Sequence, residues 1–184
     1  MLIKEAREIT GGLSKPSKMP GPSINLPATQ CITGAKLVKV KGSTCSGCYA
    51  LKGRYRFPNV KEAMARRLAK LHDPRWVEAM VTLINKQPVF RWHDSGDLQS
   101  VQHLKNIFEV CNRTPDTMHW LPTREARFLR LMGCPSARTP SISSWTWPWL
   151  ISRKNLQRNT SSFPGCISSR SSPAGAGSRS SKSP

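Results

Sequence analysis

Residues 88–125, PVFRWHDSGDLQSVQHLKNIFEVCNRTPDTMHWLPTRE, decide the fold of this chain. The short apolar run at 88–92 predicts a strand, and the polar loop at 93–97 follows it. Apolar residues then recur at helical spacing over 101–111, and a second strand is expected at 117–121. Two strands joined by a helix of this length predict a parallel pair with a crossover connection, the building block of α/β sheets and barrels.

Two further helices are expected upstream of this unit. The capping box Asn59-x-x-Glu62 begins the first, and Asp73 followed by Pro74 begins a second that ends at Asn85. Their apolar residues recur at helical spacing and are assigned to the core. The fold class is therefore α/β: a partial parallel β/α sheet or an incomplete barrel, with an N-terminal Cys-containing loop and a disordered C-terminal tail.

Composition changes sharply after Glu125. The 184 residues are 38% hydrophobic, which suffices for one domain with a core. Residues 126–184 contain nine basic residues, no acidic ones and 15 serines. Such a segment buries too little apolar surface to offset the entropy of ordering. We therefore expect a metal-binding domain at 1–133 and a disordered Ser/Arg/Pro-rich tail at 134–184, which is either an RNA-binding tail or an out-of-frame terminus.

Three cysteines form the most specific chemical pattern. Cys45 and Cys48 make a CxxC motif in a Gly-containing loop, and Cys31 lies fourteen residues upstream. A two-residue spacer lets two sulfurs reach one ion, and thiolates favour zinc and iron–sulfur clusters. A metal site at Cys31, Cys45 and Cys48 is the leading hypothesis. Redox chemistry of the Cys45/Cys48 pair and three unligated thiols are the alternatives.

Both predicted strands end in polar loops. Because ligands in α/β folds bind beyond the carboxyl ends of the strands, these loops are expected to share a cleft that binds a small charged molecule. The candidate residues, besides His93, are Asp94, Ser95, Gly96, Asp97, Arg124 and Glu125. Structural roles compete with this reading: Asp97 as a helix cap, Glu125 paired with Arg124 or Arg127, and His119 packed in the core.

The ordered motifs resemble the phage-borne gene product 88 family over about residues 14–130. They are 18–28, Cys31, 45–55, 90–97 and 119–125. The resemblance implies that Cys31, Cys45 and Cys48 are cluster ligands and that the 95–97 loop lines the cleft. Family members are expected to continue with further strands and a second Cys-rich segment, from which this chain departs at about Phe128. The layout also resembles radical S-adenosylmethionine enzymes at a distance, which implies S-adenosylmethionine as a cosubstrate.

Two classes of function follow. The first is an iron–sulfur enzyme in which Asp94, Asp97 and Arg124 hold a small charged cosubstrate above the cluster. The second is a zinc-stabilised nucleic-acid-binding protein, which the formal charge of +19 favours. An inactive truncated product is a third reading. The sequence shows no apolar run that could span a bilayer and no signal peptide, so we expect a cytoplasmic protein, in the host cytoplasm if phage-encoded.

Overall fold

A computed structural model of the chain describes residues 1–17, 19–132 and 150–151. Its centre is a sheet of four strands in the order β1-β2-β3-β4. The strands are β1 (Ser23–Ile24), β2 (Val89–Trp92), β3 (Met118–Trp120) and β4 (Leu150–Ile151). The first three are parallel neighbours, and β4 runs antiparallel to β3. The α/β class is thus confirmed, with an open sheet in which three neighbouring strands are parallel.

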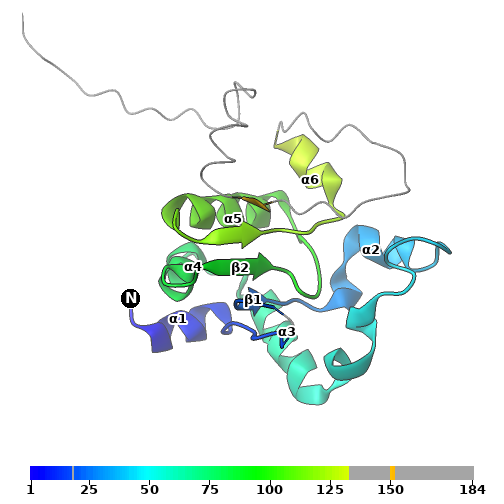
Figure 1. Cartoon of the computed structure of the whole chain (residues 1–184), viewed down its shortest axis with the longest axis horizontal. Coiled ribbons are helices and arrows are strands. Elements are labelled where there is room, and N and C mark those ends of the chain that lie inside the picture. Colours follow the sequence, from blue (N-terminus) through cyan, green and yellow to red (C-terminus); the bar gives the residue numbers. More distant parts are fainter. Residues whose placement is uncertain (18, 133–149, 152–184) are drawn as a thin grey trace, which may run out of the picture.

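Helices surround this sheet (Figure 1). The α-helices of the described residues are α1 (Ile3–Thr10), α2 (Ile32–Leu37), α3 (Pro58–Lys70), α4 (Trp76–Ile84), α5 (Val101–Arg113) and α6 (Ala126–Leu131). The same described residues form three short 3₁₀ helices: η1 (Ala28–Gln30), η2 (Tyr49–Leu51) and η3 (Gly53–Arg56). Helix α2 and the segment after it lie on the opposite side of the molecule from α1 and α4. Among the described residues, no helix is long and apolar enough to cross a membrane.

The β2-α5-β3 unit has the arrangement that the sequence predicts. Phe90 pairs with His119, and Arg91 pairs with Trp120, in parallel register. Helix α5 begins where the Ser100 hydroxyl accepts the N–H of His103 at 3.0 Å. Serine is a preferred N-cap because its oxygen satisfies an N–H group that lacks a partner within the helix.

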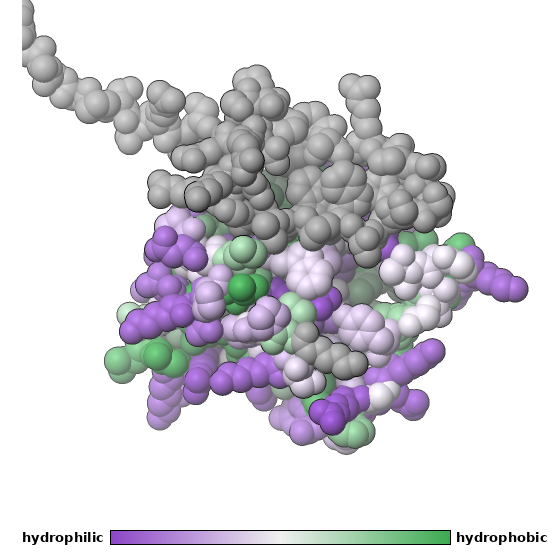
Figure 2. Space-filling model, viewed as in Figure 1, coloured by the Kyte–Doolittle hydropathy of each residue, from purple (hydrophilic) through white to green (hydrophobic). Residues whose placement is uncertain are grey.

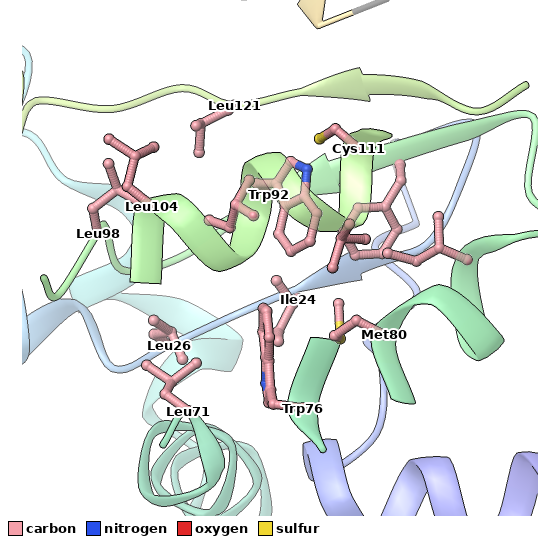
Figure 3. Packing of buried hydrophobic residues seen from close by; sticks show 14 of the residues in the cluster. Ile24, Leu26, Leu71, Trp76, Met80, Trp92, Leu98, Leu104, Cys111 and Leu121 are labelled. Carbon is pink, nitrogen blue, oxygen red and sulfur yellow. The ribbon is translucent and has the colours of Figure 1, made fainter. Parts of the chain in front are cut away.

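The core lies on one face of the sheet. Phe90 and Trp92 of β2 point into it, while Arg91 between them lies on the other face. Figure 3 shows Trp92 next to Ile24 and Trp76, all three completely buried. Full burial of such side chains stabilises the fold by roughly 1.5–3 kcal/mol each. Cys111 and His119 also lie in this core, as expected.

The predicted helix starts differ from the observed ones. Helix α3 begins at Pro58, with Phe57 before it, so the capping box at Asn59 is wrong. Proline fits the first helical position because its missing N–H would lack an intrahelical partner there. The Asn59 side chain instead accepts the N–H of Val60. Asp73 accepts the N–H of Arg75 at 2.8 Å, in a turn that precedes α4.

The predicted tail is described at two residues. Leu150 and Ile151 form β4 and pair with Trp120 and His119. The remainder of 134–184, like residue 133, lies outside the described residues.

Candidate functional site

Asp97 joins the two strand-end loops. Its Oδ1 accepts the Leu98 N–H at 2.7 Å and the Thr123 hydroxyl at 2.6 Å. Its Oδ2 accepts the Arg124 N–H at 2.7 Å. Burial raises the pKa of Asp97, and these hydrogen bonds oppose the rise. The two loops therefore meet at one edge of the sheet, and Asp97 does not cap α5, whose N-cap is Ser100.

Glu125 connects the second loop to residues 31–48, here called the cysteine segment because it contains Cys31, Cys45 and Cys48. Its side chain is completely buried, and its Oε1 accepts the Thr33 N–H at 2.6 Å. Oε2 accepts the Thr33 hydroxyl at 2.9 Å and lies 3.2 Å from Arg127 Nε. The pairing with Arg127 is one of the structural roles that the sequence suggests. Thr33 follows Cys31 by two residues, so Glu125 fixes the start of α2.

Arg124 makes a second connection to the same segment. Its Nη2 donates a hydrogen bond to the Thr44 hydroxyl, next to Cys45. Two consecutive residues of one loop thus hold the cysteine segment at both ends. Sequence reasoning missed Thr33 and Thr44, because a threonine carries no signal of a partner 80 or more residues away.

The thiols of Cys31 and Cys45 lie on the same side of α2, against Gly34. A Cβ atom added at Gly34 would lie 3.6 Å from Cys31 Sγ and 3.7 Å from Cys45 Sγ. Burial raises the pKa of Cys31 to about 12, and the negative charges of Asp97, Cys48, Cys45 and Glu125 add to the rise. The structure therefore brings the three predicted cysteines into one neighbourhood with Asp97 and Glu125.

This neighbourhood lacks the arrangement of a preformed metal site. Among the described residues, no group of three or more His, Cys, Asp or Glu side chains is placed to hold a metal ion. The donor chemistry nevertheless fits a soft metal, since two half-buried free thiols, Cys31 and Cys45, lie beside Gly34, and a third, Cys48, follows three residues after Cys45. Burial raises the pKa of Cys31 and of Cys45, so a bound cation would be needed to favour the thiolate form of these two residues.

Asp94 fixes the other flank of the cysteine segment. Its Oδ1 accepts the Ser23 hydroxyl at 2.5 Å, and its Oδ2 accepts the Tyr55 hydroxyl at 2.9 Å. The Tyr49 hydroxyl donates to the Asp94 carbonyl oxygen. Arg91 Nη2 lies 3.3 Å from that same hydroxyl. Asp94 thus ties β1 to η2 and η3, the turns directly after the CxxC motif.

Ser95 and Gly96 pack against the chain that follows β1. The Ser95 hydroxyl donates to the Leu26 carbonyl at 3.0 Å, and the Leu26 N–H donates to the Ser95 carbonyl at 2.9 Å. Gly96 has φ +79°, and a Cβ there would lie 2.6 Å from the Leu26 Cβ. His93, at φ 60°, is buried 5.2 Å from the His103 ring. These residues are held by contacts within the protein.

A family model described as gene product 88 matches residues 2–142. No curated protein matches the chain, and no solved structure does. The resemblance to radical S-adenosylmethionine enzymes is therefore unsupported. The match begins before residue 14 and continues past the expected departure at Phe128, so the shared sequence is longer than the motifs alone suggest. Since the match covers well over half of the chain, this protein belongs to the gene product 88 family, the phage family that its motifs resemble.

Proposed function

We propose that this chain is an iron–sulfur protein in which Cys31, Cys45 and Cys48 bind a cluster at the carboxyl edge of the parallel strands. The observation that carries the proposal is the placement of the Cys31 and Cys45 sulfurs against Gly34, at 3.6 and 3.7 Å from the same point. Cys48 belongs to the same turn, because its N–H donates to the Cys45 carbonyl at 3.1 Å. The proposal takes Cys48 as the third ligand, from the same turn as Cys45.

One cation, Arg124, acts on the cysteines together with the carboxylates of Asp97 and Glu125. Burial raises the pKa of Cys45, and the positive charge of Arg124 opposes this rise. A guanidinium at this place stabilises thiolates and compensates the charge of a bound cluster. Asp94 and Glu125 fix the loop through Tyr55 and Thr33, so the cysteine backbone is positioned before any metal binds.

Three protein ligands leave room for a fourth. Iron–sulfur clusters commonly take four cysteines, so a three-cysteine site has one position for a small molecule. A bound cluster would supply electron transfer or activate a ligand at that position. We place a small charged cosubstrate, of the type of S-adenosylmethionine, beside Arg124, because a guanidinium pairs well with a carboxylate. Asp94 and Asp97 then act through the loops that they hold, since their oxygens already accept hydrogen bonds.

Zinc is the alternative occupant, and metal analysis separates the two. The full chain is purified without oxygen, and iron, zinc and acid-labile sulfide are measured per chain together with the visible spectrum. Iron and sulfide in comparable amounts, with a broad visible absorption that oxygen bleaches, support the cluster. Zinc without sulfide contradicts the cluster and supports a structural zinc site. A protein that contains neither iron nor zinc contradicts both the cluster and the zinc site.

A further inference from the structure

Positive charge is concentrated in the segment that carries the CxxC motif. Residues 36–61, here called the basic lobe, contain no Asp or Glu. Its basic residues are all exposed: Lys36, Lys39, Lys41, Lys52, Arg54, Arg56 and Lys61. Residues 62–132 carry eleven basic against eight acidic residues, so charge there is close to balanced. The lobe therefore has a positive field that the neighbouring part of the domain does not share.

Hydrogen bonds join the basic lobe to the rest of the domain. It contains η2 and η3 and extends from α2 to the start of α3, on the side of the sheet away from α1 and α4 (Figure 1). Arg124 and Asp94 hold it through Thr44 and Tyr55. Hydrophilic side chains project from the lower edge of the face shown in Figure 2, where Figure 1 places α3. A held backbone presents its cations in a fixed pattern and reduces the entropy lost when a ligand binds.

Two large aromatic side chains are exposed among these cations. Tyr49 is 56% exposed and Phe57 is 55% exposed. The Tyr49 ring lies 5.8 Å from that of Tyr55, which supports it from one side. Exposed aromatic rings interleaved with Lys and Arg are the arrangement on which unpaired bases stack while cations contact the phosphates.

We propose that the basic lobe binds single-stranded nucleic acid. Its Lys and Arg side chains contact phosphates, and Tyr49 and Phe57 stack on bases. A duplex fits less well, because its bases are already stacked on one another and present no free face to these rings. Two of the proposed cluster ligands, Cys45 and Cys48, lie in the lobe, but none of the cations or aromatic rings that carry this proposal is a cluster ligand.

The test measures the binding of the full chain to a fluorescent 20-nucleotide oligothymidylate by anisotropy, over a range of salt concentrations. The lobe variant is Lys52→Glu, Arg54→Glu and Arg56→Glu together. The matched control is Lys4→Glu, Lys86→Glu and Lys105→Glu, three exposed positions outside the lobe with the same change in charge. The tail is identical in both variants, so its charge cancels in the comparison.

The lobe variant should bind at least tenfold more weakly than the control. The slope of log K against log salt concentration should become shallower by about two, at about 0.7 for each of the three phosphates that are no longer neutralised. Equal weakening in the two variants would show that only net charge matters and would overturn the proposal. So would binding to a duplex of the same length as tight as to the single strand. Binding to phosphatidylserine vesicles without binding to the oligonucleotide would identify a membrane surface instead.

Phe57 tests stacking separately from charge. Phe57→Ala should weaken oligothymidylate binding by about five- to a hundredfold, the range for removing one base–aromatic stack. Phe57→Trp should restore it, because a larger ring keeps the stacking face. If Ala and Trp at this position bind alike, the aromatic residues do not contact bases and the proposal fails in this part.

Discussion

Glu125 and Thr33 lie 92 residues apart in the sequence and are joined by two hydrogen bonds, at 2.6 Å to the Thr33 N–H and 2.9 Å to its hydroxyl. This contact attaches the start of α2 to the loop between β3 and α6. Cys31 precedes α2 directly, so the position of one proposed cluster ligand depends on a carboxylate in a distant loop.

The first prediction concerns this contact. Glu125→Ala should lower the free energy of unfolding by about 2–4 kcal/mol, because it leaves the Thr33 N–H without its acceptor and Arg127 without its partner. Urea denaturation measures the change, and hydrogen exchange should accelerate at residues 31–37. Glu62→Ala is the control, since that carboxylate is 80% exposed and pairs weakly with Arg66. Similar destabilisation in both variants would contradict the role given to Glu125.

The second prediction concerns Asp97. Both carboxylate oxygens of Asp97 accept hydrogen bonds from N–H or O–H groups. Asp97→Asn replaces one of these oxygens by an NH₂ group, which cannot accept them. The unfavourable meeting of two donors should cost about 1–3 kcal/mol in urea denaturation. Asp116→Asn, at an exposed position, should change stability by less than about 0.5 kcal/mol. An Asp97 variant as stable as the parent would mean that the two loops do not depend on this carboxylate.

The third prediction compares two glycines with nearly the same backbone. Gly96 has φ +79° and Gly42 has φ +81°. An added Cβ meets Leu26 at 2.6 Å at position 96 but meets nothing within 4 Å at position 42. Gly42→Ala should cost about 1–2 kcal/mol, the strain of a left-handed alanine, whereas Gly96→Ala should cost at least about 2 kcal/mol more. Equal melting temperatures would contradict the close packing of the 93–97 loop on the chain after β1.

The fourth prediction concerns acid stability. Burial lowers the pKa of His103 and of His119 to about 4, and lowers the pKa of His93 well below its usual value. Between pH 6.5 and about 4 the unfolded chain binds protons that the folded chain does not. Stability is therefore retained above pH 6.5 and lost as the pH falls through this window, by about 1.4 kcal/mol per pH unit for each histidine.

Urea denaturation at several pH values measures this slope. His119→Asn removes one group that takes up a proton on unfolding, so the slope should fall by about 1.4 kcal/mol per pH unit. This holds whatever the variant does to stability at neutral pH. A slope that is the same in parent and variant would show that His119 is protonated in the folded state as easily as in the unfolded one.

Sequence reasoning reached the β2-α5-β3 unit because its signals are local. Helical spacing and strand length can both be recognised in a short window. Strand β1 was missed, since Ser23–Ile24 is too short to show alternation and depends on β2 for its hydrogen bonds. The convergence of the two loops followed from parallel topology.

The partners of the site residues could not be predicted. The contacts of Tyr55 with Asp94 and of Thr33 with Glu125 join segments that are distant in the sequence. Neither a tyrosine nor a threonine indicates such a partner from the sequence alone. The sequence therefore placed the carboxylates at the right edge of the sheet but assigned them to a ligand. In the structure their oxygens bind the cysteine segment and the loops.

The proposed cluster site is tested by comparing single cysteine variants after anaerobic purification. Iron and sulfide per chain are measured for the parent, Cys45→Ser and Cys111→Ser, with circular dichroism to establish that each is folded. Cys111 is a buried core thiol and serves as the matched control. If the three cysteines hold a cluster, Cys45→Ser loses most of the iron and sulfide, since a serine hydroxyl is a poor ligand for a soft metal, while Cys111→Ser keeps them. Equal metal content in the two folded variants would contradict the proposed cluster site.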